Sequence, residues 1–100
     1  MDKYSVRLSP QAYRDIDEIY TYIKEELFAV KAAEDIADHL EDAILSLREF
    51  PERGAERKVG RYAGLGYRQL FADHYIVIYR IDKSSRTVIV MTIKYAYRNF

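Results

Sequence analysis

The chain has 100 residues, of which 49% are hydrophobic and 32% are charged, so it has room for one domain (residues 1–100) with one core. It contains no cysteine, which excludes disulfides and thiolate metal sites, and no apolar run approaches the ~20 residues that span a bilayer. The net charge is zero, but residues 1–50 carry six Lys/Arg and twelve Asp/Glu, whereas residues 51–100 carry ten and four. The chain as a whole lacks the positive net charge that is typical of nucleic-acid-binding proteins. Its second half is basic, however, and could attract an acidic protein partner or phosphates.

The first 50 residues predict one strand followed by two helices. Residues 4–8 alternate apolar and polar side chains, which is typical of a half-buried strand. Ser9 and Pro10 then mark a helix start, because Ser caps a backbone N–H and Pro suits the first helical position. Two apolar stripes follow, separated near residues 28–31 without a glycine or proline: Ala12, Ile16, Ile19, Tyr20, Ile23 and Leu27, then Ala33, Ile36, Ala37, Leu40, Ala43, Ile44 and Leu47. They predict an antiparallel helical hairpin, which Pro51 ends.

The second half predicts a loop and three strands. Residues 51–66 hold all four glycines and four basic residues, and we expect a loop there. The apolar period then becomes two, which predicts strands over residues 67–71, 75–81 and 87–95 with short turns between them. Short turns produce antiparallel pairing. The predicted fold is α+β in the order β-α-α-β-β-β, with the long helical hairpin packed on one face of a mainly antiparallel twisted sheet.

Alternation divides this predicted sheet into two faces. The set assigned to the helices and core is bulky and uncharged: Tyr67, Gln69, Phe71, Tyr75, Val77, Tyr79, Ile81, Thr87, Ile89, Met91, Ile93 and Tyr95. The other set has an apolar middle ringed by cations: Arg68, Leu70, Ile76, Ile78, Arg80, Val88, Val90, Thr92 and Lys94, with Arg98 beyond the strand end. An apolar strip with a cationic rim and no helix left to cover it is a candidate binding surface, whereas the alternative is an open face that the cations merely solvate.

Three segments together resemble the RelE/ParE superfamily of bacterial toxins, also called plasmid stabilisation proteins. Residues 4–16 (YSVRLSPQAYRDI) resemble the opening strand and helix cap of these toxins, and residues 66–71 (GYRQLF) and 75–82 (YIVIYRID) resemble two later strands. The resemblance extends over essentially the whole chain. It implies the toxin of a type II toxin–antitoxin system, which arrests bacterial growth and is held inactive by a cognate acidic antitoxin.

The resemblance leaves two cellular targets open. RelE-like toxins cut messenger RNA in the ribosome without a metal ion, whereas ParE-like toxins poison DNA gyrase and are not nucleases. RNA cleavage needs a base, an acid and cations for the phosphorane charge, and the matching positions here are Arg68, Lys94, Tyr97 and Arg98. Leu70 and Ile76 stand where a RelE-like set has further cations. We therefore expect a gyrase-binding toxin, with an endoribonuclease and a non-toxic antitoxin-binding relic as alternatives.

The expected binding surface for the target or the antitoxin combines the strip, its rim and the aromatic C-terminus. Its residues are Arg68, Leu70, Ile76, Ile78, Arg80, Lys94, Tyr95, Tyr97 and Arg98. No metal or other cofactor is expected, because His39 and His74 lack partners at metal-ligand spacing. The chain begins in a strand pattern instead of an apolar leader, which predicts a cytoplasmic protein without membrane contact. A homodimer through the exposed seam of the hairpin is compatible with the sequence.

Overall fold

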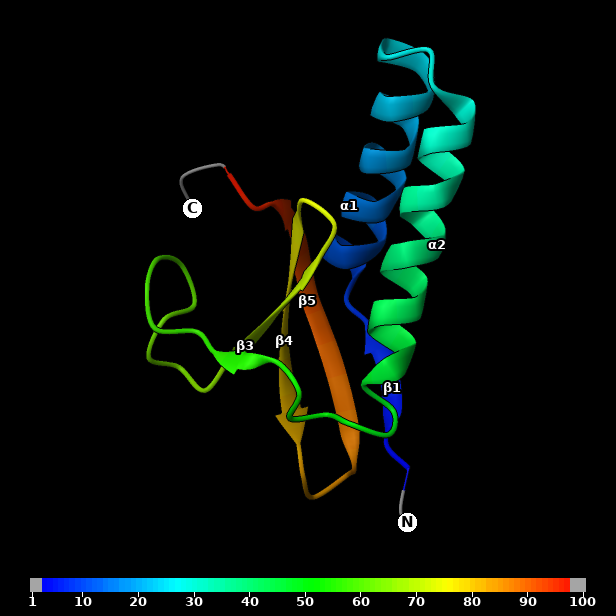
Figure 1. Cartoon of the computed structure of the whole chain (residues 1–100). Helices are drawn as coiled ribbons and strands as arrows, with labels where there is room; N and C mark the ends of the chain where they lie inside the picture. The colour runs from blue at the N-terminus through cyan, green and yellow to red at the C-terminus, as the bar shows by residue number, and fades with distance from the viewer. Residues whose placement is uncertain (1–2, 98–100) are drawn as a thin grey trace.

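The computed structural model describes residues 3–97 and contains a helical hairpin packed against a five-stranded sheet (Figure 1). The predicted order of one strand, two helices and three strands is confirmed, and a two-residue strand is added inside the predicted loop. Among the described residues, no helix is both long and apolar enough to cross a membrane. In chain order the elements are β1 (Ser5–Leu8), α1 (Pro10–Thr21), the π-helical turn η1 (Tyr22–Glu26), α2 (Val30–Ser46), β2 (Ala55–Glu56), β3 (Arg68–Ala72), β4 (Tyr75–Asp82) and β5 (Thr87–Tyr95).

The five strands lie in the order β1-β5-β4-β3-β2. β1 runs parallel to β5, and the other three neighbouring pairs are antiparallel, which confirms the predicted mainly antiparallel α+β fold. The strands β3, β4 and β5 alternate in direction because short turns join them. The hairpin of α1 and α2 covers one face of the sheet, as Figure 1 shows.

The start of α1 is fixed both to its own helix and to the sheet. The Ser9 hydroxyl accepts a hydrogen bond from the Ala12 N–H at 3.0 Å, which confirms the predicted cap. The same hydroxyl donates to the Met91 carbonyl at 2.7 Å. The predicted break between the helices is also confirmed, since η1 ends at Glu26 and α2 begins at Val30.

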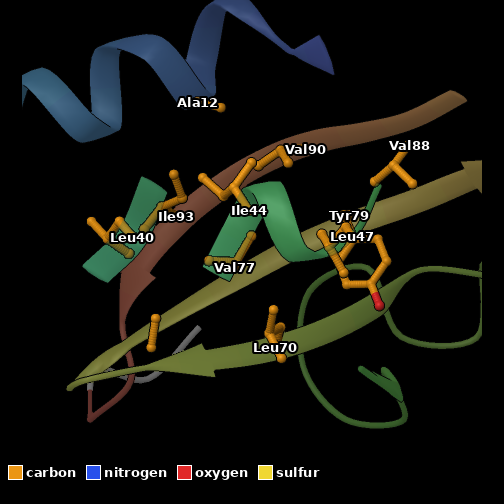
Figure 2. Packing of buried hydrophobic residues seen from close by; sticks show 11 residues of the cluster. Ala12, Leu40, Ile44, Leu47, Leu70, Val77, Tyr79, Val88, Val90 and Ile93 are labelled. Atoms are coloured by element: carbon orange, nitrogen blue, oxygen red, sulfur yellow. The ribbon is translucent and has the colours of Figure 1, made fainter. Parts of the chain in front are cut away.

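The hydrophobic core fills the space between the hairpin and the sheet (Figure 2). Leu40 and Leu47 of α2 are 1% and 0% exposed, and Val77 of β4 opposite them is 0% exposed. Burial of one such side chain contributes roughly 1.5–3 kcal/mol. The buried cluster consists of Ala12, Leu40, Ile44, Leu47, Leu70, Ala72, Val77, Tyr79, Val88, Val90 and Ile93.

The predicted faces of β3 were wrong by one residue of register. Ala72 pairs with Tyr75, so the turn between β3 and β4 contains only two residues. Leu70 therefore faces the helices and lies in the core, whereas Phe71 faces away and is 60% exposed. A shift of one residue moves every side chain of a strand to the opposite face. The sequence predicted a turn of three residues, 72–74. Because the observed turn is one residue shorter, every side chain of β3 lies on the face opposite to the predicted one.

The predicted faces of β5 were wrong before Met91 and right after it. Val88 and Val90 lie in the core, and Ile89 faces away from the helices. The pairing of β4 with β5 is irregular at Met91, which is the extra residue of a β-bulge. A bulge exchanges the faces of the residues that follow it. Lys94 consequently lies on the predicted face, opposite the helices.

Candidate interaction site

The sheet face opposite the helices, the open face, has an apolar centre and exposed cations. Ile76 and Ile78 form the centre, but they are only 6% and 0% exposed, so their side chains are covered and the accessible surface of this face lies around them. Arg80 follows them on β4, is exposed, and pairs with Ile89. Ile89 in turn pairs with the exposed Arg7 of β1, so two cations flank one apolar residue. The sequence missed Arg7, although its alternation with the half-buried Val6 and Leu8 placed it on this face.

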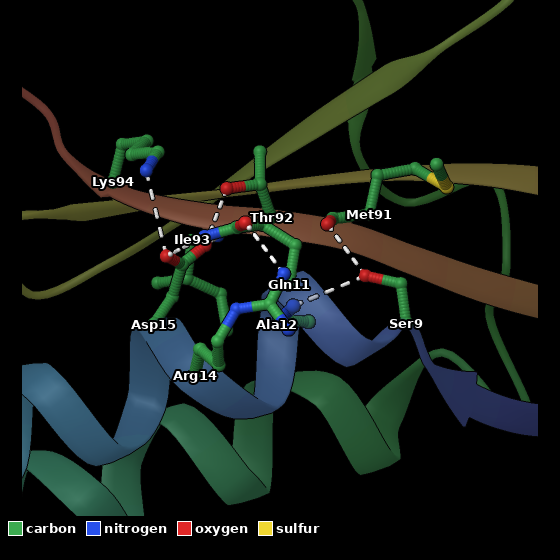
Figure 3. A network of polar contacts seen from close by, with 9 residues as sticks. All are labelled: Ser9, Gln11, Ala12, Arg14, Asp15, Met91, Thr92, Ile93 and Lys94. Carbon is green, nitrogen blue, oxygen red and sulfur yellow. Dashed lines mark hydrogen bonds and ion pairs between the residues drawn. The ribbon is translucent and has the colours of Figure 1, made fainter.

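Lys94 lies on the open face too, but its ammonium group is engaged by a buried carboxylate (Figure 3). Lys94 Nζ is 3.4 Å from Oδ1 of Asp15, which is 3% exposed. Asp15 also accepts hydrogen bonds from the Thr92 hydroxyl, from the Ile93 N–H at 3.0 Å and from the Gln11 amide at 2.7 Å. Burial alone would raise the pKa of Asp15, but these hydrogen bonds and the Lys94 charge outweigh it and hold the pKa below its ordinary value.

Asp15 takes this position because α1 lies along an edge of β5. β1 pairs with β5 only over Thr87–Val90, and beyond that point α1 supplies the partners of the β5 backbone. Asp15 thus satisfies an edge N–H that another strand would otherwise bind. Asp15 was not among the residues predicted for the site. Its position in the sequence could have indicated burial, because Asp15 lies on the apolar stripe of the helix, three residues after Ala12 and four before Ile19.

Arg68 and Leu70, by contrast, lie on the helix side of the sheet. Arg68 pairs with Tyr79, whose side chain is in the core. The Arg68 guanidinium donates to the carbonyls of Gly54 at 2.9 Å and Glu52 at 3.0 Å. The Gly54 N–H donates to the Tyr79 hydroxyl at 3.0 Å. Arg68 therefore fixes the segment between α2 and β2 and does not share a surface with Lys94.

Arg57 is a buried cation that the sequence marked only as one of four basic residues in a loop. Its side chain is 7% exposed, and its Nε donates to the Arg61 carbonyl at 2.8 Å. Its guanidinium also donates to the Gln69 amide oxygen at 3.0 Å, and Gln69 pairs with Ile78 on the open face. A basic residue in a glycine-rich loop gives no sequence signal of burial, so only the structure could find it.

The predicted aromatic residues Tyr95 and Tyr97 gather where β5 ends. Their ring centroids are 5.3 Å apart, and Tyr97 is 5.6 Å from the exposed His74. Tyr95 is 5.8 Å from Tyr75, and burial, followed by the neighbouring tyrosines, raises the pKa of the Tyr75 hydroxyl. Arg98 lies outside the described residues. Within residues 3–97, no group of three His, Cys, Asp or Glu side chains is placed to hold a metal ion.

A helical hairpin on a mixed sheet with one open face is the fold of a class of small bacterial toxins. Residues 6–100 match the family described as the ParE toxin of the type II toxin–antitoxin system parDE. The chain belongs to this family, which confirms the predicted membership of the RelE/ParE superfamily.

Individual relatives agree with this family. Over 75 residues, 75% of this chain and 74% of the relative, the sequence is 35% identical to toxin ParE1 of Caulobacter vibrioides. Among solved structures, the chromosomal ParDE system of P. aeruginosa is similar with a TM-score of 0.75 at 18% identity, covering 95% of this chain and 98% of that one. The RelBE2 complex of Mycobacterium tuberculosis is similar with a TM-score of 0.69 at 20% identity, covering 93% and 98%. These two similarities show the fold.

Proposed function

We propose that this toxin arrests growth by binding DNA gyrase and has no RNA-cleaving activity of its own. The observation that carries the proposal is the separation of Arg68 and Lys94, which lie on opposite faces of the sheet. Each also has an internal partner, backbone carbonyls for Arg68 and the Asp15 carboxylate for Lys94. RNA cleavage needs its cations close to one phosphate. Two cations held apart in this way favour binding over catalysis.

The test is a supercoiling reaction with purified gyrase and relaxed plasmid, into which the toxin is titrated. We expect loss of supercoiled product, while messenger RNA translated in the presence of the toxin stays intact. Undiminished supercoiling at saturating toxin contradicts the gyrase proposal. Cuts in the translated message would favour the endoribonuclease alternative, in which Arg98→Ala abolishes them. A chain that binds its antitoxin and never slows growth would be the non-toxic relic.

We further propose that a cognate antitoxin neutralises the toxin by laying an acidic segment across the open face. Two structural neighbours are described as toxin–antitoxin assemblies. The exposed cations Arg7 and Arg80 around the apolar centre suit an acidic partner, because charges at the rim of an interface set its orientation and association rate.

Arg80→Glu tests this surface in a titration of toxin with antitoxin. We expect the affinity to fall by roughly tenfold, because the substitution puts like charges in contact. Lys31→Glu, the same charge change on the exposed surface of α2, is the matched control and should bind as the wild type does. Equal affinity of all three proteins would place the antitoxin elsewhere.

A further inference from the structure

The turn that joins the two helices exposes large apolar side chains. Phe28 is 90% exposed, Leu27 is 55% exposed and Val30 is 49% exposed. We call these three residues the hairpin tip. In Figure 1 the tip lies at the top, where the hairpin extends past the end of the sheet. It is therefore a surface separate from the open face.

Phe28 at the hairpin tip occupies a backbone conformation that ordinarily selects glycine. Its φ is 52°, and it directly follows Leu27, the C-cap residue of η1. Glycine is usual at this position because a Cβ is strained at positive φ, and a bulky side chain there is exceptional. With 90% of its surface exposed, Phe28 also recovers little packing energy in the free protein. Positive φ also occurs at Tyr62 and Arg86, so the feature that points to a partner is the combination of this strain with an almost fully exposed apolar side chain.

The hairpin tip is nevertheless held in place by the structure beneath it. Ile23 and Ala33 are 5% and 1% exposed and close the two helices against each other. The Ala29 N–H donates to the Ile23 carbonyl at 3.1 Å, and the Ala33 N–H donates to the Ala29 carbonyl at 2.9 Å. The first helix ends in the π-helical turn η1, a feature frequent at functional sites. A fixed tip loses little entropy on binding.

The charge around the hairpin tip indicates the chemistry of its partner. Residues 17–38 carry seven Asp/Glu and two Lys. Lys31 is paired with Asp35, and Lys24 lies 5.7 Å from the centroid of the Tyr20 ring. The outer half of the hairpin is therefore acidic with an apolar end. A complementary protein surface has an apolar pocket with Lys or Arg at its rim.

We propose that the hairpin tip is the surface by which the toxin docks on its protein target, with Phe28 entering an apolar pocket that has a basic rim. The inference rests on the proposed function in one respect, namely that the toxin binds its target instead of cleaving it. It assigns target binding to the hairpin and leaves the open face to the antitoxin.

Phe28→Gly separates this role from any role in folding. Glycine removes the apolar side chain and relieves the strained φ, so the thermal midpoint should be equal to or higher than that of the wild type. Growth arrest on expression and inhibition of purified gyrase should each weaken by about tenfold or more, while antitoxin affinity is unchanged. Phe28→Asn, which tolerates the same φ, should behave alike. Leu65→Ser removes a 71% exposed apolar side chain from the β2–β3 loop and should keep full potency.

The charge of the partner is tested by reversal at Glu25 and Glu26. The double variant E25K/E26K should inhibit more weakly than the wild type at low ionic strength, and the difference should shrink as salt screens the exposed charges. A double variant that inhibits more strongly would assign an acidic pocket to the target and overturn the proposal.

Each remaining outcome has a defined meaning. Wild-type potency of Phe28→Gly in the growth assay overturns the proposal. If Phe28→Gly stays toxic but no longer binds the antitoxin, the hairpin tip belongs to the antitoxin interface. If it stays toxic but no longer self-associates, the tip belongs to an interface with a second copy of the chain. Either result overturns the proposal. If the wild type leaves gyrase unaffected while Phe28→Gly still abolishes growth arrest, the gyrase proposal fails and the docking proposal stands. A wild-type chain without effect on growth overturns both.

Discussion

At the scale of single residues, the Asp15 carboxylate joins α1 to β5 through the Ile93 N–H, the Thr92 hydroxyl and the Lys94 ammonium group, and the Gln11 amide of α1 itself completes its hydrogen bonds. A buried carboxylate is stable only when its hydrogen bonds are made, because its transfer out of water costs several kcal/mol. Here every oxygen of the group has a partner. The charged residue in the apolar stripe of α1 therefore fixes the position of the helix against β5.

Asp15→Asn should lower the free energy of unfolding by about 2–3 kcal/mol at neutral pH, because it removes charge-assisted hydrogen bonds and leaves Lys94 without its counter-ion. Asp17→Asn, on the exposed side of the same helix, is the control and should change it by less than about 0.5 kcal/mol. Urea denaturation measures both. Equal stability of the two variants would show that the Asp15 contacts contribute nothing net.

The same carboxylate makes stability depend on pH. The pKa of Asp15 in the folded protein lies below its ordinary value of 3.8. Its contribution is therefore fully present above the range in which an unfolded Asp titrates, and is lost as the pH falls through the lowered pKa. Asp15→Asn should accordingly lose less stability on acidification than the wild type does, and parallel pH profiles would contradict this.

At the scale of elements, an ion pair joins α2 to the two-residue turn between β3 and β4. His39 Nδ1 lies 2.7 Å from Oδ2 of Asp73, and both residues are at the surface. Asp73 could not be predicted as the partner of His39 from the sequence, because the two residues are 34 positions apart in the chain. The hydrogen bond with Asp73 and then the charge of Asp73 raise the pKa of His39.

His39→Gln should lower the thermal midpoint in acid and leave it unchanged in alkali. A raised folded pKa gives a contribution that is fully present below the ordinary His pKa of 6.5 and is lost as the pH rises through the raised value. Thermal melts across this range measure the difference. Asp73→Asn removes the other partner and should reproduce the profile; a variant effect that grows with pH would refute the ion pair as its cause.

At the scale of the whole molecule, the strand order concentrates stability in the centre of the sheet. β4 lies between β5 and β3, and its residues Val77, Ile78 and Tyr79 are each 0% exposed. β2 is a two-residue strand at the sheet edge. Amide hydrogen exchange should therefore be slowest in β4 and β5, at the free energy of global unfolding, and fastest in β2. Equal protection of β2 and β4 would contradict this order.

The sequence alone was sufficient for the elements of the fold and their order. The Ser9-Pro10 cap, the two helical stripes and the switch to alternation after residue 66 are local patterns. Each predicted element occupies the segment that carries its pattern. Family resemblance came from the same local segments. Arg80 on the open face could also be placed, because the extra residue of the bulge, Met91, lies in β5 and β4 itself alternates without interruption.

The tertiary structure decided which side chains meet. A turn of two residues instead of three put Leu70 in the core and Arg68 on the helix side, and the bulge at Met91 returned Lys94 to the open face. The partners of Asp15 and Arg57 come from distant strands and loops. The physical reason is common to all of these. The periodicity of a segment determines its own conformation. The face and the partners of its side chains depend on register, which a change of one residue shifts and which no single segment encodes.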